Sequence, residues 1–193
     1  MKETIKWIKK SLNYKFNDEE LLKLALTHRS FSSKNNERLE FLGDAVLSII
    51  ISDLIYREKS LSNEGDLTRL RAYLVKESTL CQIAKNINLS PHIHVGPGEN
   101  KSGTRHRCSV LSDTLEALLG AVYLDSGFEN TFSVIQELYE EVLSKLPSMD
   151  QLKDSKTRLQ EIIQKESMNL PEYSIANITG QDHLQKFYVR CSV

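Results

Sequence analysis

The stretch Asn36-Glu-Arg-Leu-Glu-Phe-Leu-Gly-Asp-Ala-Val-Leu47 sets the pattern of the chain. Asparagine at position 35 or 36 can cap a helix N-terminus, and the segment 37–58 that follows is apolar around most of its circumference, which is typical of a central helix. Apolar spacing up to about residue 146 is helical in the further segments 17–26, 63–75, 78–87, 112–124 and 130–146. The sequence therefore predicts a mainly α, all-helical first domain.

The pattern changes twice along the chain. Proline and glycine cluster between residues 90 and 108, which indicates a long loop. Beyond residue 150 the sequence predicts one amphipathic helix at 154–166 and then two strands, 172–178 and 186–193, joined by a turn at 179–182. Three apolar residues of that helix are expected to face inward: Leu159, Ile162 and Ile163. We expect two domains, 1–147 and 154–193, with a linker at 148–153.

Composition is that of an ordinary soluble globular protein: 193 residues, 40% hydrophobic and 26% charged. No apolar stretch approaches the ~20 residues of a membrane span, and residues 1–10 are charged throughout, unlike a signal peptide. We therefore expect a cytoplasmic protein without a membrane partner. The three cysteines (Cys81, Cys108 and Cys191) are scattered, so reduced thiols are expected. The net charge of −1 gives no support for nucleic-acid binding, and any attraction for phosphates must be local.

Acidic residues recur at helical spacing in two of the predicted helices. They share one face of each helix: Glu37, Glu40 and Asp44 in 37–58, and Asp113 and Glu116 in 112–124. Taken singly, such groups are most often solvated, or stabilise a helix N-terminus through its dipole. A binding site requires that the two helices meet.

Interior glycines in both helices indicate that the helices do meet. Glycine in mid-helix costs about 1 kcal/mol relative to alanine, so Gly43 and Gly120 are expected to serve close packing. Glu40 and Asp44 also lie among apolar residues, where a bare carboxylate is costly. Carboxylates brought together repel one another unless a cation neutralises them, and an all-oxygen site favours Mg²⁺, or Mn²⁺, over zinc. The sequence therefore predicts that the two helices bring four carboxylates together around such a cation.

One basic stretch directly precedes the second acidic helix, and it contains Lys101, Arg105, His106 and Arg107. It is either a solvated loop or a surface that holds a phosphate backbone against the metal site. The glycine-rich segment 96–103 lacks the Gly-Lys-Ser/Thr ending of a P-loop, so we expect it only to turn the chain.

These motifs resemble the ribonuclease III family. The stretch 36–47 is similar to the family signature, and three further motifs follow in the family's order: Ala25-Leu-Thr-His-Arg-Ser30, Glu64-Gly-Asp-Leu-Thr-Arg-Leu-Arg-Ala72, and the segment 113–127. The resemblance implies that Glu40, Asp44, Asp113 and Glu116 bind the catalytic metal, with Asp44 and Glu116 central to catalysis. It implies that Glu37 and Glu64 add acidic groups to the cleft. It also implies that Phe41 enters a socket on the partner subunit of a homodimer.

The tail resembles the first half of a double-stranded RNA-binding domain, whose order is α-β-β-β-α. Lys156-Thr-Arg-Leu-Gln-Glu-Ile-Ile-Gln164 is similar to the first helix of that domain. The resemblance implies minor-groove contacts by Thr157, Gln160, Glu161, Gln164 and His183. The third strand, the second helix and its lysines are not present in this sequence, so a truncated α+β domain is expected.

The resemblance implies an endoribonuclease that hydrolyses double-stranded RNA to 5′-phosphate and 3′-hydroxyl ends with short 3′ overhangs. Its expected work is processing of ribosomal RNA precursors and processing or turnover of messenger RNA. The alternative is a non-catalytic double-stranded RNA-binding protein, which would be expected to have lost some of the four carboxylates. A structural dimerisation module would account for Phe41 but not for the acids.

Overall fold

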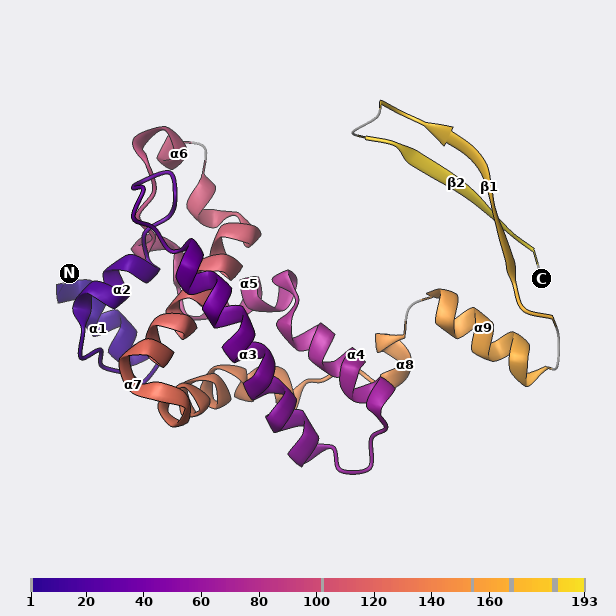
Figure 1. Ribbon diagram of the computed structural model, residues 1–193, viewed down its shortest axis with the longest axis horizontal. Coiled ribbons are helices and arrows are strands. Elements are labelled where there is room, and N and C mark those ends of the chain that lie inside the picture. Colours follow the sequence, from indigo (N-terminus) through magenta and orange to yellow (C-terminus); the bar gives the residue numbers. More distant parts are fainter. Residues whose placement is uncertain (1, 102, 154, 167–168, 182–183, 193) are drawn as a thin grey trace. The chain divides into compact units, whose positions relative to one another are not determined.

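The computed structural model describes residues 2–101, 103–153, 155–166, 169–181 and 184–192 (Figure 1). The chain divides into two compact units, Met1–Leu146 and Pro147–Val193. The first is helical, as predicted, and the second contains the α-β-β segment.

The first unit is built almost entirely from helices. They are α1 (Lys2–Ser11), α2 (Glu19–Ala25), α3 (Glu37–Glu58), α4 (Glu64–Val75), α5 (Glu77–Asn86), the 3-10 helix η1 (Ser90–His92), α6 (Pro97–Lys101), the 3-10 helix η2 (Thr104–His106) and α7 (Cys108–Ser144). Polar side chains cap several of them. Asp18 accepts a hydrogen bond from the Glu20 N–H before α2, and Asn63 does so from Asp66 before α4.

The core forms where α3 packs against α7, as Figure 1 shows for the purple and salmon helices. Leu47, Ile50 and Ile51 of α3 are fully buried, and so are Leu115 and Leu118 of α7. The prediction that segment 37–58 is a central helix is confirmed.

The α3 cap distinguishes the two asparagines before it. Asn35 Oδ1 accepts the Glu37 N–H at 3.0 Å, whereas Asn36 is buried and donates from Nδ2 to the Ala25 carbonyl at 3.2 Å. Asn36 therefore ties the start of α3 to the end of α2, and Asn35 supplies the cap.

Three expectations for the first unit need correction. The segment 90–108 is not a plain loop, because it forms η1, α6 and η2. The predicted helices 112–124 and 130–146 are parts of α7, which starts at Cys108 and is interrupted only at Gly127, where φ is 81° and ψ is −173°. A positive φ favours glycine, so the interruption falls on the one residue that tolerates it.

The third correction concerns the cysteines. Cys81 of α5 and Cys108 of α7 form a disulfide with a Cα–Cα distance of 5.0 Å, although 27 positions separate them. Reduced thiols were expected because the sequence gives no sign that the two residues are neighbours. Cys191 is free and exposed. Within the described ranges, no helix is both long enough and apolar enough to cross a membrane.

The second unit consists of α8 (Met149–Leu152), α9 (Ser155–Lys165), β1 (Glu172–Thr179) and β2 (Lys186–Ser192). The strands pair antiparallel from Glu172 opposite Ser192 to Thr179 opposite Lys186, with a bulge between Ile175 and Asn177. The short helix α8 lies within the range 148–153, where only a linker was expected.

Burial in the second unit is slight. Every described residue of β1 and β2 is exposed, and Ile163 of α9, at 3%, is the only buried residue in the described part of this unit. Leu159 is half-buried and Ile162 is 55% exposed, so the expected inward position of Ile162 is wrong. An amphipathic pattern buries a face only where another layer covers it, and among the described residues of this unit Ile163 alone is covered fully.

Candidate metal centre

Two glycines allow α3 and α7 to touch along their backbones. A Cβ added to Gly43 would overlap the main-chain carbonyl of Glu116, and one added to Gly120 would overlap that of Leu39. Each such Cβ would also lie 3.0 Å from the main-chain nitrogen of the other glycine. The predicted packing role of Gly43 and Gly120 is confirmed. Because the contact involves the Glu116 carbonyl itself, it brings this acid close to the acidic face of α3.

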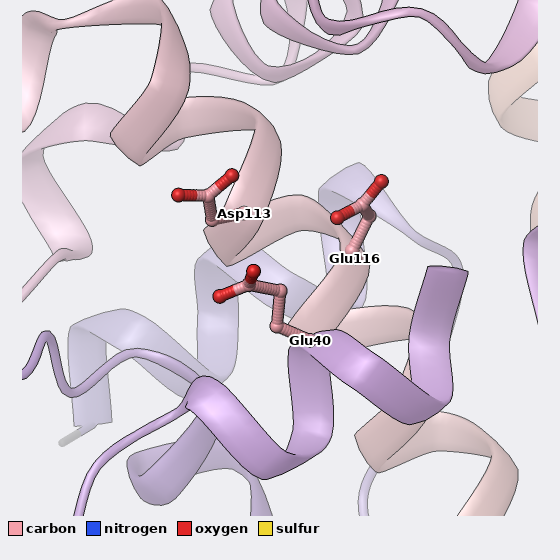
Figure 2. A group of neighbouring side chains, drawn as sticks. All are labelled: Glu40, Asp113 and Glu116. Carbon is pink, nitrogen blue, oxygen red and sulfur yellow. The ribbon is translucent and has the colours of Figure 1, made fainter. Parts of the chain in front are cut away.

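Three carboxylates converge where the two helices meet. Glu40 projects from α3 toward Asp113 and Glu116 of α7, as Figure 2 shows. One carboxylate oxygen from each residue lies within 4.8 Å of the others, and all three side chains are half-buried. An all-oxygen donor set of this kind suits a hard divalent cation such as Mg²⁺ or Mn²⁺.

The electrostatics of the cluster fit such a cation. Burial raises the pKa of Glu116 to about 8, and neighbouring carboxylates add to this, Asp44 most and Asp113 next. Burial also raises the pKa of Glu40, with Asp113 as its strongest acidic neighbour. The metal-free cluster therefore holds its negative charge unfavourably, and a bound cation would stabilise the ionised carboxylates.

Asp44 stands apart from the other predicted ligands. It lies one turn after Glu40, but it is exposed and is not part of the three-residue group. Its charge nevertheless has the largest effect on the pKa of Glu116 among the neighbouring carboxylates. The apolar surroundings expected for Asp44 are wrong, because its side of α3 faces away from the core.

The remaining predicted acids lie outside the group. Glu37 is exposed and forms an ion pair with Arg29, with 3.5 Å between Arg29 Nη1 and Glu37 Oε1. Glu64 is exposed at the start of α4, where it accepts a hydrogen bond from the Thr68 hydroxyl at 2.9 Å. This chain alone does not bring Glu64 to the three clustered carboxylates.

A polar cavity of about 570 Å³ adjoins the cluster. Its acidic lining residues are Glu37, Glu40, Glu99 and Asp113, whereas Arg29 and Arg107 supply positive charge. Arg107 directly precedes α7 and is exposed. The cavity thus places basic groups beside carboxylates, an arrangement suited to a phosphate held next to a cation.

Arg105, which was also predicted to contact RNA, is not among the residues described as lining this cavity. Arg105 is half-buried in η2. Lys101 ends α6, and its side chain lies outside the described part of the structure. His28 and Ser30 also line the cavity, although no role was predicted for either of them. Their signal was present in the motif 25–30, but a motif alone does not show which cavity its residues face.

The residues predicted to read RNA in the second unit lie along one face of α9. Thr157, Gln160 and Glu161 are half-buried, and Gln164 is exposed. Glu161 accepts a hydrogen bond from Lys153 Nζ at 2.7 Å. His183 lies outside the described residues.

Comparisons with known proteins agree with this geometry. Residues 18–143 match the model of the family described as Ribonuclease-III-like. The chain is 47% identical over 186 residues to Ribonuclease 3 of Hahella chejuensis, a match that covers 96% of this chain and 82% of the relative. The chain belongs to the ribonuclease III family.

Another relative and a solved structure agree with this assignment. Ribonuclease 3 of Variovorax paradoxus is 50% identical over 187 residues, with 96% of this chain and 82% of the relative covered. The nuclease domain of ribonuclease III from Campylobacter jejuni, solved in a study of flexibility in a region involved in dimer formation, superposes with a TM-score of 0.71. That match has 42% identity and covers 73% of this chain and 99% of the solved chain. The protein is an endoribonuclease with a mainly helical nuclease fold.

Proposed function

We propose that this ribonuclease III hydrolyses double-stranded RNA at a divalent-metal centre held by Glu40, Asp113 and Glu116, with Asp44 as a further ligand. The observation that carries the proposal is the convergence of three carboxylate oxygens within 4.8 Å beside a cavity with basic walls. Mg²⁺ is the proposed metal, and Mn²⁺ has the same preference for oxygen ligands. Asp44 is included because its charge has the largest effect of the neighbouring carboxylates on the pKa of Glu116.

The residues of the site have distinct roles in this reaction. Mg²⁺, when bound, would polarise the phosphate and lower the pKa of the attacking water. Glu40, Asp113 and Glu116 would hold it, and their burial would keep competing water away. Arg29 and Arg107 would bind phosphate oxygens of the strand that is cut. Hydrolysis would leave 5′-phosphate and 3′-hydroxyl ends.

Recognition of the duplex would come from its shape. An A-form helix presents 2′-hydroxyls in a shallow minor groove, which polar side chains can contact without reading base sequence. Thr157, Gln160, Glu161 and Gln164 are suited to this because they recur at helical spacing on α9. We therefore propose a nuclease domain at 1–147, a linker at 148–153 and an RNA-binding segment at 154–193. The expected cellular work is processing of ribosomal RNA precursors and of structured messages in the cytoplasm.

The enzyme would act as a homodimer through Phe41. This side chain is 81% exposed and lines a cavity of about 1060 Å³ whose other apolar walls include Leu21, Leu24 and Leu124. A two-fold contact requires a projecting group and a receiving surface on the same chain, and this region offers both. Two sites across such a dimer would cut both strands and leave short 3′ overhangs. Phe41 is thus proposed as a dimer contact rather than a core residue.

The metal centre is tested by Glu116→Gln. The substitution keeps the shape of the side chain and removes its charge, so we expect metal-dependent cleavage of a labelled RNA duplex to fall by roughly 100-fold or more while duplex binding survives. Glu129→Gln is the matched control, because Glu129 is exposed on the same helix. Cleavage by Glu116→Gln above about a tenth of the wild-type rate would contradict the assignment. Absence of metal-dependent cleavage in the wild type would favour the non-catalytic RNA-binding alternative.

The dimer contact is tested by Phe41→Ala in sedimentation experiments. Loss of a central aromatic anchor should raise the dimer Kd by roughly 30-fold or more, with helical content unchanged. Tyr56→Ala is the control, since Tyr56 is 71% exposed on the same helix but does not line the cavity beside Phe41. Loss of helix signal together with the dimer would identify Phe41 as a core residue instead.

A further inference from the structure

The turn after α2 places His28 in the same cavity as Asp113. His28 is half-buried, and it lines this cavity together with Arg29 and Arg107. Its main chain is fixed, because the His28 N–H donates to the His94 carbonyl at 3.0 Å and the His94 N–H donates to the Leu26 carbonyl at 2.8 Å. This parallel bridge holds the histidine at a defined place in the cavity wall.

Hydrogen bonds also orient the imidazole ring of His28. The Ser30 N–H donates to His28 Nδ1 at 3.1 Å, and Ser30 Oγ lies 2.8 Å from the same nitrogen. Ser30 Oγ in turn accepts the Gly96 N–H at 3.0 Å, which leaves the hydroxyl proton of Ser30 directed to Nδ1. Because Nδ1 accepts, the ring carries its proton on Nε2.

The Ser30 contact depends on Gly96, which belongs to the segment 96–103 that was expected only to turn the chain. A Cβ at Gly96 would overlap the main-chain carbonyl of Ser30. Glycine at this position therefore lets the segment after His94 lie against Ser30. Hydrogen bonds that connect Gly96, Ser30 and His28 thus hold the Nδ1 edge of the imidazole ring in place.

The opposite ring edge remains available. In the described ranges, no side chain or main-chain group forms a hydrogen bond with His28 Nε2. This donor belongs to a ring in a cavity wall that also contains two arginines and four carboxylates, two of which (Glu40 and Asp113) belong to the proposed metal centre. An N–H donor at this place can bind an anionic oxygen. The surrounding carboxylates cannot, because an ionised carboxylate has no proton to donate.

We propose that His28 Nε2–H donates a hydrogen bond to a non-bridging oxygen of an RNA backbone phosphate next to the metal centre, and that Ser30 is its positioning residue. The inference rests on the proposed function, since it takes the cavity to be the place where the RNA strand is held. The contact adds a third donor to those of Arg29 and Arg107. It therefore helps to fix the position of the phosphate beside the metal centre.

Two substitutions separate this role from a purely structural one. The amide of asparagine occupies the position of Nδ1, so His28→Asn keeps an acceptor for Ser30 but has no donor at the position of Nε2. Glutamine reaches the Nε2 position with an N–H donor but lacks the Nδ1 acceptor. A phosphate contact requires the donor at the Nε2 position, which only glutamine keeps. A role in stabilising the turn requires the acceptor at the Nδ1 position, which only asparagine keeps.

The experiment measures duplex affinity of the full chain in the Glu116→Gln background with Mg²⁺, using a labelled RNA duplex. We expect His28→Asn to weaken binding by roughly 10- to 100-fold, the range for a hydrogen bond to a charged group. His28→Gln should recover most of that loss because it keeps the donor, but it should stay roughly threefold or more weaker than the parent because it lacks the support of Ser30. His94→Asn is the matched control, because His94 lies on the partner segment of the same bridge and its ring packs 5.7 Å from the Phe31 ring. Thermal melting shows whether each variant is folded.

The possible results are distinct. Full affinity in His28→Asn, or equal losses in the asparagine and glutamine variants, would overturn the phosphate contact. Cleavage by Glu116→Gln at more than about a tenth of the wild-type rate would refute the metal centre, and the affinity comparison would then be made without Mg²⁺, where the duplex stays uncut. Failure of the inference is thereby distinguishable from failure of the proposed function.

Discussion

The helical unit Met1–Leu146 and the unit Pro147–Val193 both have amphipathic sequence patterns, yet only the first has a core. Among the residues that the structure describes, every buried side chain except Ile163 belongs to the helical unit. In that unit, helices cover one another on several sides. In the other, two strands pair with each other and expose both faces.

The difference determines what chemistry each unit can support. Carboxylates can be held half-buried and close together only where surrounding packing fixes their backbones, as α3 and α7 do for Glu40 and Glu116. The helix α9 offers polar side chains on a surface, which suits contact with a groove but does not bring carboxylates together in a half-buried site. The unit Met1–Leu146, which has a core, is therefore suited to hydrolysis, and the unit Pro147–Val193, which has little burial, is suited to contact with an RNA groove.

The largest effect is expected from Gly43→Ala, which disrupts the contact between α3 and α7 in the helical unit. A methyl group there would overlap the Glu116 carbonyl, so the variant should lose about 3 kcal/mol or more of unfolding free energy and most of its cleavage activity. Gly98→Ala is the control, because a Cβ at that helical position meets nothing within 4 Å. Urea unfolding measures both. A gain of about 1 kcal/mol for Gly43→Ala, as at an open helical site, would show that the helices do not touch there.

A smaller effect is expected from the disulfide, which strengthens the packed unit further. Removal of the bond by Cys81→Ser should lower the unfolding free energy by about 2–4 kcal/mol, because the bond closes a long loop in the unfolded chain. Cys191→Ser should be without effect, since Cys191 is free and exposed. Denaturation with and without reductant tests the bond directly. Equal stability of the oxidised and reduced protein would contradict a contribution from Cys81–Cys108.

Limited proteolysis tests the low stability expected of the unit Pro147–Val193. With so little burial, Pro147–Val193 should open at a low free-energy cost and be cut roughly tenfold or more faster than Met1–Leu146. Mass spectrometry of the fragments over time locates the first cuts, which we expect beyond Pro147. The helical fragment should retain its far-UV signal. A tail that resists protease as long as the helices do would show that the second unit is more stable than its burial indicates.

The smallest expected effect is on the pH dependence of stability. The folded pKa of Glu116, about 8, lies above its ordinary value of 4.5, so folding favours the protonated form. The resulting stability is fully present below about pH 4.5 and is lost as pH rises through 8. Without metal, Tm should therefore fall by a few degrees over this window, and less so in Glu116→Gln. An unchanged slope in the variant would show that other groups cause the loss.

Addition of Mg²⁺ should change this pH dependence of stability. Because the cation requires ionised carboxylates, its stabilising effect on the wild type should grow with pH across the same window. Thermal melts at fixed Mg²⁺ measure it, and Glu116→Gln should respond less than Glu129→Gln.

Much of the helical unit follows from the sequence, because helix formation depends on neighbours a few positions apart. The bounds of α3, the cap at Asn63 and the shared face of Glu40 and Asp44 all arise from local spacing. The packing role of Gly43 and Gly120 is also evident, since each is unfavourable in an isolated helix. Motif order was specific enough to indicate the ribonuclease III family.

Only the tertiary structure decided which groups meet. It brought Glu40, Asp113 and Glu116 within 4.8 Å and left Asp44 exposed, although all four have similar spacing in sequence. It joined Cys81 to Cys108, whose separation of 27 positions gave no indication of contact.

The support of His28 by Ser30 and Gly96 was decided at the same level. Each of these outcomes depends on the distance between segments far apart in the chain. That distance is set by how closely α3 and α7 pack and by how the turns between helices return, and the periodicity of a single helix contains no information about either.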